Sequence, residues 1–180
     1  LQSVFGTAMA AMTYWRRGFV SLKALIPAIA LTYAGSLLGA LAVRQVDVGL
    51  LNVAVPLALI GIALYFLFAP SLSDADKAAR LPFGPFVPVM GMIIGFYDGI
   101  FGPGTGSFLT IGFVMLFGLG LTRASGHTKV LNLVSNLAAL TIFIPAGDVV
   151  WPAAIAMAAG QVAGQTEVTI TYQPRYLSVA

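Results

Sequence analysis

Long apolar runs separated by short polar junctions make up most of the chain. The runs cover residues 4–14, 25–43, 48–68, 86–117, 129–144 and 149–163. A membrane helix needs roughly 20 consecutive apolar residues, so the second and third runs are long enough to span a bilayer and the first is about half a span. The pattern predicts an all-α, polytopic integral membrane protein.

A glycine-rich segment interrupts the run over residues 86–117. It reads Gly95-Phe-Tyr-Asp-Gly-Ile-Phe-Gly-Pro-Gly-Thr-Gly-Ser107 and leaves two arms of about 15 and 11 residues, each short of a full span. In lipid, every backbone N–H and C=O needs a partner within the protein, so a break persists where it is buried or lines a wet cavity. Substrate sites of transporters have this character, and we expect a broken or re-entrant helix pair here.

Two segments are more polar than the rest. Residues 70–85 form a polar loop in which Ser73 and Asp76 are spaced to cap a short surface helix. Residues 166–180 alternate as a strand does and cannot continue a membrane helix, so they are either a solvated tail or foreign sequence. We therefore expect a single transmembrane domain over residues 1–165 and a divergent polar tail over residues 166–180.

A faint internal repeat relates the two ends of the domain. Leu1-Gln-Ser-Val4 resembles Leu131-Asn-Leu-Val134, and Gly35-Ser-Leu-Leu-Gly39 resembles Gly160-Gln-Val-Ala-Gly164. The glycines alone are also what helix packing requires. In both halves, however, a similar polar and apolar opening is followed by a pair of glycines four residues apart. This common order favours internally duplicated halves, a common plan among secondary transporters.

The distribution of basic residues bears on topology. Lys and Arg follow the first run, precede the fourth and precede the fifth, whereas the junction after the second run carries Arg44 alone. If the fourth run crosses the membrane once, these residues fall on both faces; if it forms a hairpin, nearly all fall on one face. The positive-inside rule favours the hairpin, which makes the two repeats inverted.

Composition agrees with a membrane protein and narrows its chemistry. The chain is 59% hydrophobic and 8% charged, against about a quarter charged in soluble domains. Its net charge of +3 comes from residues at the ends of apolar runs, so no nucleic-acid partner is expected. With no cysteine and one histidine, we expect no metal, no cofactor and no enzyme activity. An intramembrane enzyme would need a pair such as Ser107 and His127, and nothing in the sequence orients that base.

Two residues are candidates for proton coupling. Asp98 is an acid deep in an apolar run, which is costly and marks a site or a proton relay; its alternative role is to cap the broken backbone. His127 can change charge near neutral pH.

The break also offers a candidate anion site. Free amides at the start of a helix bind anions through their N–H groups and the helix dipole. The alternative is a re-entrant turn that needs glycine only for its backbone conformation. The candidate substrate-binding residues here are Gly102, Gly104, Thr105, Gly106 and Ser107.

A second polar group lies after the break. Lys129, Asn132 and Asn136 share one helical face by their spacing. Lys129 attracts an anion or serves as an interface anchor, and the asparagines bind substrate or bond between helices. Gln2 is the counterpart of Asn132 in the repeat, so it is a candidate for the same cavity.

These residues together resemble the TauE/SafE family of membrane transporters, which includes sulfite and sulfoacetate exporters. The resemblance rests on Gly95–Ser107, on His127-Thr-Lys-Val-Leu-Asn-Leu-Val-Ser-Asn136 and on Gly160–Gly164, and covers roughly residues 1–165. It implies a multi-pass exporter of small, organosulfur or sulfite-like anions in the bacterial inner membrane, with the bilayer and an anionic substrate as partners. A channel or a structural membrane subunit is the alternative, and the oligomeric state stays open.

The chain departs from the family pattern at both ends. Family members begin with another glycine-rich broken segment and continue with further basic and apolar sequence beyond position 166. We therefore expect the domain over residues 1–165 to be incomplete at both ends and to lack one half of the substrate cavity.

Overall fold

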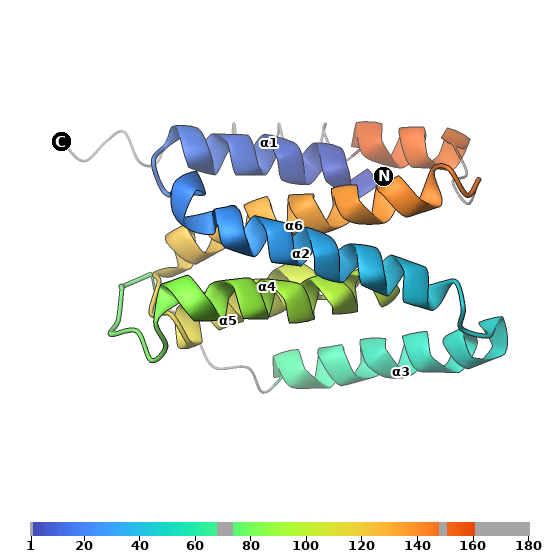
Figure 1. The fold of residues 1–180 in the computed structure, drawn as a ribbon, viewed down its shortest axis with the longest axis horizontal. Helices are drawn as coiled ribbons and strands as arrows, with labels where there is room; N and C mark the ends of the chain where they lie inside the picture. Colours follow the sequence, from blue (N-terminus) through green and yellow to red (C-terminus); the bar gives the residue numbers. More distant parts are fainter. Residues whose placement is uncertain (1, 68–73, 148–150, 161–180) are drawn as a thin grey trace.

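The computed structural model describes residues 2–67, 74–147 and 151–160 (Figure 1). They form the helices α1 (Gln2–Arg16), α2 (Leu22–Val43), α3 (Val48–Leu67), α4 (Phe83–Ile100), α5 (Thr105–Met115) and α6 (Leu121–Phe143), followed by a helix over Trp151–Gly160. No strand occurs in these described ranges, which confirms the predicted all-α class. Within the same ranges, α2 and α4 are long and apolar enough to cross a membrane.

Helices α2 and α4 run side by side in the same direction and pack by close backbone contact (Figure 1). A Cβ atom on Gly35 would overlap the Met92 carbonyl group, and one on Gly99 would overlap the Ser36 carbonyl oxygen. Small residues are what lets two membrane helices approach this closely. The glycines of both helices therefore set the distance between α2 and α4.

The helix break is shorter than the sequence predicts. Helix α4 continues through Gly95 and Asp98 for 18 residues, and only residues 101–104 separate it from the 11 residues of α5. Gly95 was expected to belong to the break, but a Cβ there would meet the Thr32 backbone of α2 at 2.6 Å. The break itself needs Gly102 and Gly104, whose φ angles of 80° and 85° are left-handed.

Helices α4 and α5 form a hairpin. The Lys77 N–H, before α4, donates to the Gly118 carbonyl oxygen, after α5, at 2.8 Å. The Gly120 N–H likewise donates to Asp76 Oδ1 at 2.5 Å. The start of α4 and the end of α5 thus lie at the same end of the molecule (Figure 1). The predicted hairpin is present in the fold, while its orientation in a membrane stays a prediction.

The segment over residues 74–82 acts as a strap across the start of α6. We predicted that Ser73 and Asp76 cap a short surface helix, but residues 74–82 form none, and Ser73 lies outside the described residues. Asp76 instead binds the Gly120 N–H and pairs with Arg123 at 2.7 Å. Helix α6 begins at Leu121 rather than at Lys129, because these contacts order its first turns.

The corner between α1 and α2, the strap and the start of α6 lie at one end of the molecule, at the left of Figure 1. Six basic residues belong to these segments. A Cβ on Gly126 of α6 would meet Val20 and Tyr14, so the corner between α1 and α2 lies beside the start of α6. We call this the basic end; its six basic residues are Arg16, Arg17, Lys23, Lys77, Arg80 and Arg123. The second half of the predicted repeat, over residues 160–164, and the tail over 166–180 reach beyond the described residues, so the duplication and the domain limits stay predictions.

Candidate functional site at the helix break

Asp98 and Thr105 meet across the break. Thr105 Oγ1 lies 2.5 Å from Asp98 Oδ1 and 2.8 Å from the Gly102 carbonyl oxygen. A hydroxyl has one hydrogen, so it cannot donate to both oxygens at once. Both contacts become hydrogen bonds when a protonated Asp98 donates to Thr105, which in turn donates to Gly102. The geometry therefore suits a carboxyl group that carries a proton.

The first turn of α5 offers backbone donors beside this pair. The N–H groups of Ser107 and Phe108 donate to the Gly104 carbonyl oxygen at 2.9 and 3.0 Å. Those of Thr105 and Gly106 have no backbone acceptor among the described residues. These two amides, at the positive end of the α5 dipole, are thus the ones available to an anion.

Polar residues of α6 complete the site. A Cβ on Gly106 would lie 3.8 Å from Asn132 Nδ2, so Asn132 faces the start of α5. Asn136 Nδ2 donates to the Asn132 carbonyl oxygen at 2.6 Å and thus joins the site through Asn132. Ser135 Oγ donates to the Asn132 carbonyl oxygen at 3.0 Å and lies close to the Asp98 carboxyl group. The structure therefore brings together Asp98, Gly102, Thr105, Gly106, Asn132 and Asn136.

Two residues of the site were missed by sequence reasoning. Ser135 is fully buried, and its backbone carbonyl oxygen accepts a hydrogen bond of 2.7 Å from Ser36 Oγ of α2. Ser135 follows Asn132 by one helical turn, which was the available signal for it. Ser36 lies between the packing glycines Gly35 and Gly39, so its sequence context pointed to packing alone.

His127 lies far from Asp98. Its Nδ1 atom is 2.7 Å from the Arg123 carbonyl oxygen, and its ring packs on Phe83 and Phe113 with centroids 5.8 and 5.4 Å away. Phe83 begins α4, and Asp98 lies about 22 Å further along that helix at 1.5 Å per residue. A direct exchange between these two groups is therefore not built into this arrangement.

The remaining predicted residues contribute less to the arrangement. Lys129 is half-buried and has no hydrogen bond or ion pair with another described residue. Gln2 lies in α1, outside the part of the chain whose side chains the structure describes. Within the described ranges, no group of three or more His, Cys, Asp or Glu is placed to hold a metal ion.

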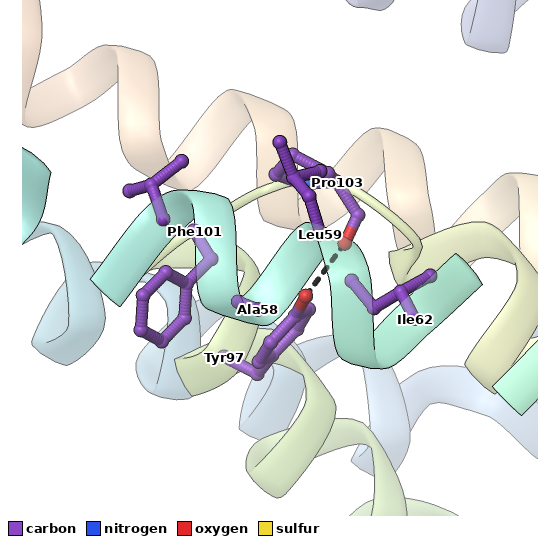
Figure 2. Close-up of a pocket in the computed structure, with 7 residues that line it drawn as sticks. Ala58, Leu59, Ile62, Tyr97, Phe101 and Pro103 are labelled. Carbon is purple, nitrogen blue, oxygen red and sulfur yellow. Dashed lines mark hydrogen bonds between the residues drawn. The ribbon is translucent and has the colours of Figure 1, made fainter. Parts of the chain in front are cut away.

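An apolar surface covers the break on the side of α3. Tyr97 donates its hydroxyl hydrogen to the Pro103 carbonyl oxygen at 2.7 Å and so holds the loop of the break (Figure 2). A pocket between α3 and the loop has no interior space of the size of a water molecule. Its lining residues are Val55, Ala58, Leu59, Ile62, Tyr97, Phe101 and Pro103. On this side the polar site is closed.

Comparison with known proteins gives a consistent result. The family model described as "Sulfite exporter TauE/SafE" matches residues 1–165. The chain is 44% identical over 166 residues to a protein of Sinorhizobium sp. named "Probable membrane transporter protein ORF9", covering 91% of this chain and 63% of that protein. It is 41% identical over 164 residues to the "Probable membrane transporter protein YfcA" of Escherichia coli K12, covering 91% and 61%.

A third relative, from Haemophilus influenzae and named "Probable membrane transporter protein", is 37% identical over 164 residues, covering 91% of this chain and 64% of the relative. The chain thus spans less than two thirds of the length of these curated relatives. No solved structure matches the chain significantly.

Proposed function

Because the chain belongs to the sulfite exporter TauE/SafE family, we propose that it acts as a secondary transporter that exports small anions and couples their movement to protons. The family match and the names of the relatives support a membrane transporter. Sulfite and organosulfur anions are the substrate class that the family description suggests. The contact between Asp98 and Thr105 at the start of α5 carries the proposal of proton coupling.

The anion binds at the first turn of α5 in this mechanism. The amides of Thr105 and Gly106 donate to it, and Asn132 faces the same turn from α6. Lys129 lies one turn before Asn132 on α6 and draws the anion along that face. An oxyanion there supplies a hydrogen-bond acceptor to the Thr105 and Gly106 amides, as anions do at other helix N-termini.

Charge links the anion to the proton. An ionised Asp98 would stand next to the bound anion, and two unit charges 4 Å apart repel by roughly 4 kcal/mol at an effective dielectric constant of 20. Protonation of Asp98 removes this repulsion and satisfies both oxygens around Thr105. The anion and the proton therefore occupy the site together, and alternating access carries both across the membrane.

Flux measurements in proteoliposomes test this mechanism. We use a sulfonate whose own charge is constant near neutral pH. The unmodified protein is expected to transport it faster as the pH falls, whereas Asp98→Asn, which mimics the protonated group, transports it with little pH dependence. Asp47→Asn, at the exposed junction between α2 and α3, is the matched control and should behave as the unmodified protein.

Two outcomes would contradict the proposal. An Asp98→Asn variant with an unchanged pH profile removes Asp98 from coupling. Flux that does not saturate and is accompanied by single-channel currents indicates a channel instead of a carrier.

A further inference from the structure

The basic end carries more positive charge than the protein itself neutralises. Its six basic side chains come from the corner between α1 and α2, from the strap before α4 and from the first turn of α6, and all are exposed. The two acids beside them are already engaged: Asp74 accepts the Thr122 N–H at 2.7 Å, and Asp76 binds both Gly120 and Arg123. Within the described ranges, the five basic residues other than Arg123 form no salt bridge.

The strap fixes the position of part of this charge. The N–H groups of Arg80 and Leu81 donate to the Leu116 carbonyl oxygen at 2.9 and 3.0 Å, and that of Lys77 donates to Gly118. The backbone that carries Lys77 and Arg80 is therefore bound to the connection between α5 and α6. The charges form a built surface rather than a set of independent loop residues.

Trp15 and the first residues of α2 and α4 indicate the level of the basic end relative to the membrane. Trp15 directly precedes the two arginines at the end of α1, and 48% of its surface is exposed. Tryptophan prefers the level of the lipid headgroups. The apolar helices α2 and α4 both begin at this end, at Leu22 and Phe83, so the basic side chains stand at the edge of the hydrocarbon layer.

We propose that the basic end is a docking surface for anionic phospholipids, whose phosphate groups lie between the corner of α1 and α2 and the strap. A phosphodiester at headgroup depth supplies the negative charge that the protein lacks there, and polybasic surfaces attract such lipids. Arg16 and Arg17 form one side of the surface, and Lys77 and Arg80 form the other. This inference does not depend on transport activity.

Quenching of Trp15 fluorescence by brominated lipid tests the proposal. The chain has two tryptophans, so a Trp151→Phe background leaves Trp15 as the reporter. In detergent micelles, brominated phosphatidylglycerol should reach half-maximal quenching at a concentration about tenfold below that of brominated phosphatidylcholine, and about 0.5 M salt should remove the difference. The variants Arg16→Gln/Arg17→Gln and Lys77→Gln/Arg80→Gln should each need about tenfold more phosphatidylglycerol.

Arg44→Gln is the matched control because Arg44 is an exposed arginine at the opposite end, and it should leave quenching unchanged. Equal quenching of the Trp151→Phe protein by the two lipids would overturn the proposal. This comparison keeps all the basic residues, so it does not depend on whether the charge variants fold. Loss of phosphatidylglycerol preference in Arg44→Gln would also overturn it. Displacement of the lipid by free glycerol phosphate at the same concentration would indicate a site for soluble phosphate instead.

Discussion

At the scale of single residues, glycine serves two separate purposes in this chain. Gly99 and Gly35 lie inside helices and let α2 and α4 touch through their backbones. Gly102 and Gly104 lie between helices and supply left-handed backbone conformations. Replacement of glycine is therefore unfavourable for different reasons at the two kinds of position. Inside the helices a larger side chain lacks space, and between them it disfavours the left-handed φ angle.

Gly99→Ala is expected to loosen the contact between α2 and α4. The new methyl group would overlap the Ser36 carbonyl oxygen and approach the Ala40 nitrogen, and overpacking of this kind costs roughly 1–3 kcal/mol. The melting temperature in detergent should fall. Gly61→Ala in α3 is the control, since a Cβ there meets nothing within 4 Å; an equal loss in both variants would show that packing is not the cause.

At the scale of helices, the sequence predicts which segments are helical better than it predicts where they end. The break was expected from Gly95 onward, yet α4 continues to Ile100 because Gly95 fits against Thr32 of α2. A local pattern cannot reveal that partner. Similarly, the polar residues before Lys129 resemble a loop, and only their contacts with the strap show that they belong to α6.

Only the parts of the candidate site that are unusual within their own segment could be predicted from the sequence. Asp98 and the glycines of the break stand out because they are unusual in an apolar run. The separation of His127 from Asp98, and the contribution of Ser36, depend on how α2, α4 and α6 pack. These features follow from tertiary contacts that no single segment encodes.

The strap should hold the hairpin in a pH-dependent manner. The Gly120 N–H, and after it the Arg123 side chain, lower the pKa of the Asp76 carboxyl group below its ordinary value of 3.8. A lowered pKa in the folded state means that the stabilisation is present above the ordinary pKa and is lost as the pH falls through the folded-state pKa. The unmodified protein should therefore melt at a higher temperature than Asp76→Asn at neutral pH, and the difference should shrink in acid below about pH 4.

Melting curves of both proteins across this pH range provide the measurement. Asp47→Asn is a suitable control because Asp47 caps the Gly49 N–H at the other end of the molecule. A gap between the unmodified protein and Asp76→Asn that stays constant into acid would show that the charge of Asp76 does not support the strap.

At the scale of the whole molecule, the hairpin places the start of α4 and the start of α6 at one end. The same end holds six basic residues, whereas the junction between α2 and α3 holds Arg44 and Asp47. By the positive-inside rule, we expect the basic end to face the cytoplasm.

Labelling of single cysteines tests this topology, and the absence of natural cysteine makes it direct. Cysteines at Ala78 and Leu121 should react with a membrane-impermeant reagent from the cytoplasmic side only. A cysteine at Gln45, which is exposed beyond the end of α2, should react from the other side only. Reaction of Ala78→Cys and Leu121→Cys from opposite sides would show that α4 and α5 do not form a hairpin in the membrane.

The close contact between Ser36 of α2 and Gly99 of α4, the residue after Asp98, also fixes how deeply Asp98 lies in an electric field. Ser36 is about 21 Å from the start of α2, a helix about 33 Å long, so this level is about two thirds of the way from the basic end. A charge that crosses a full membrane potential gains about 2.3 kcal/mol per 100 mV. A proton that reaches Asp98 from the basic end would therefore gain or lose about 1.5 kcal/mol per 100 mV in an evenly falling field. A change of 100 mV in the membrane potential would thus change the ratio of protonated to ionised Asp98 by about tenfold.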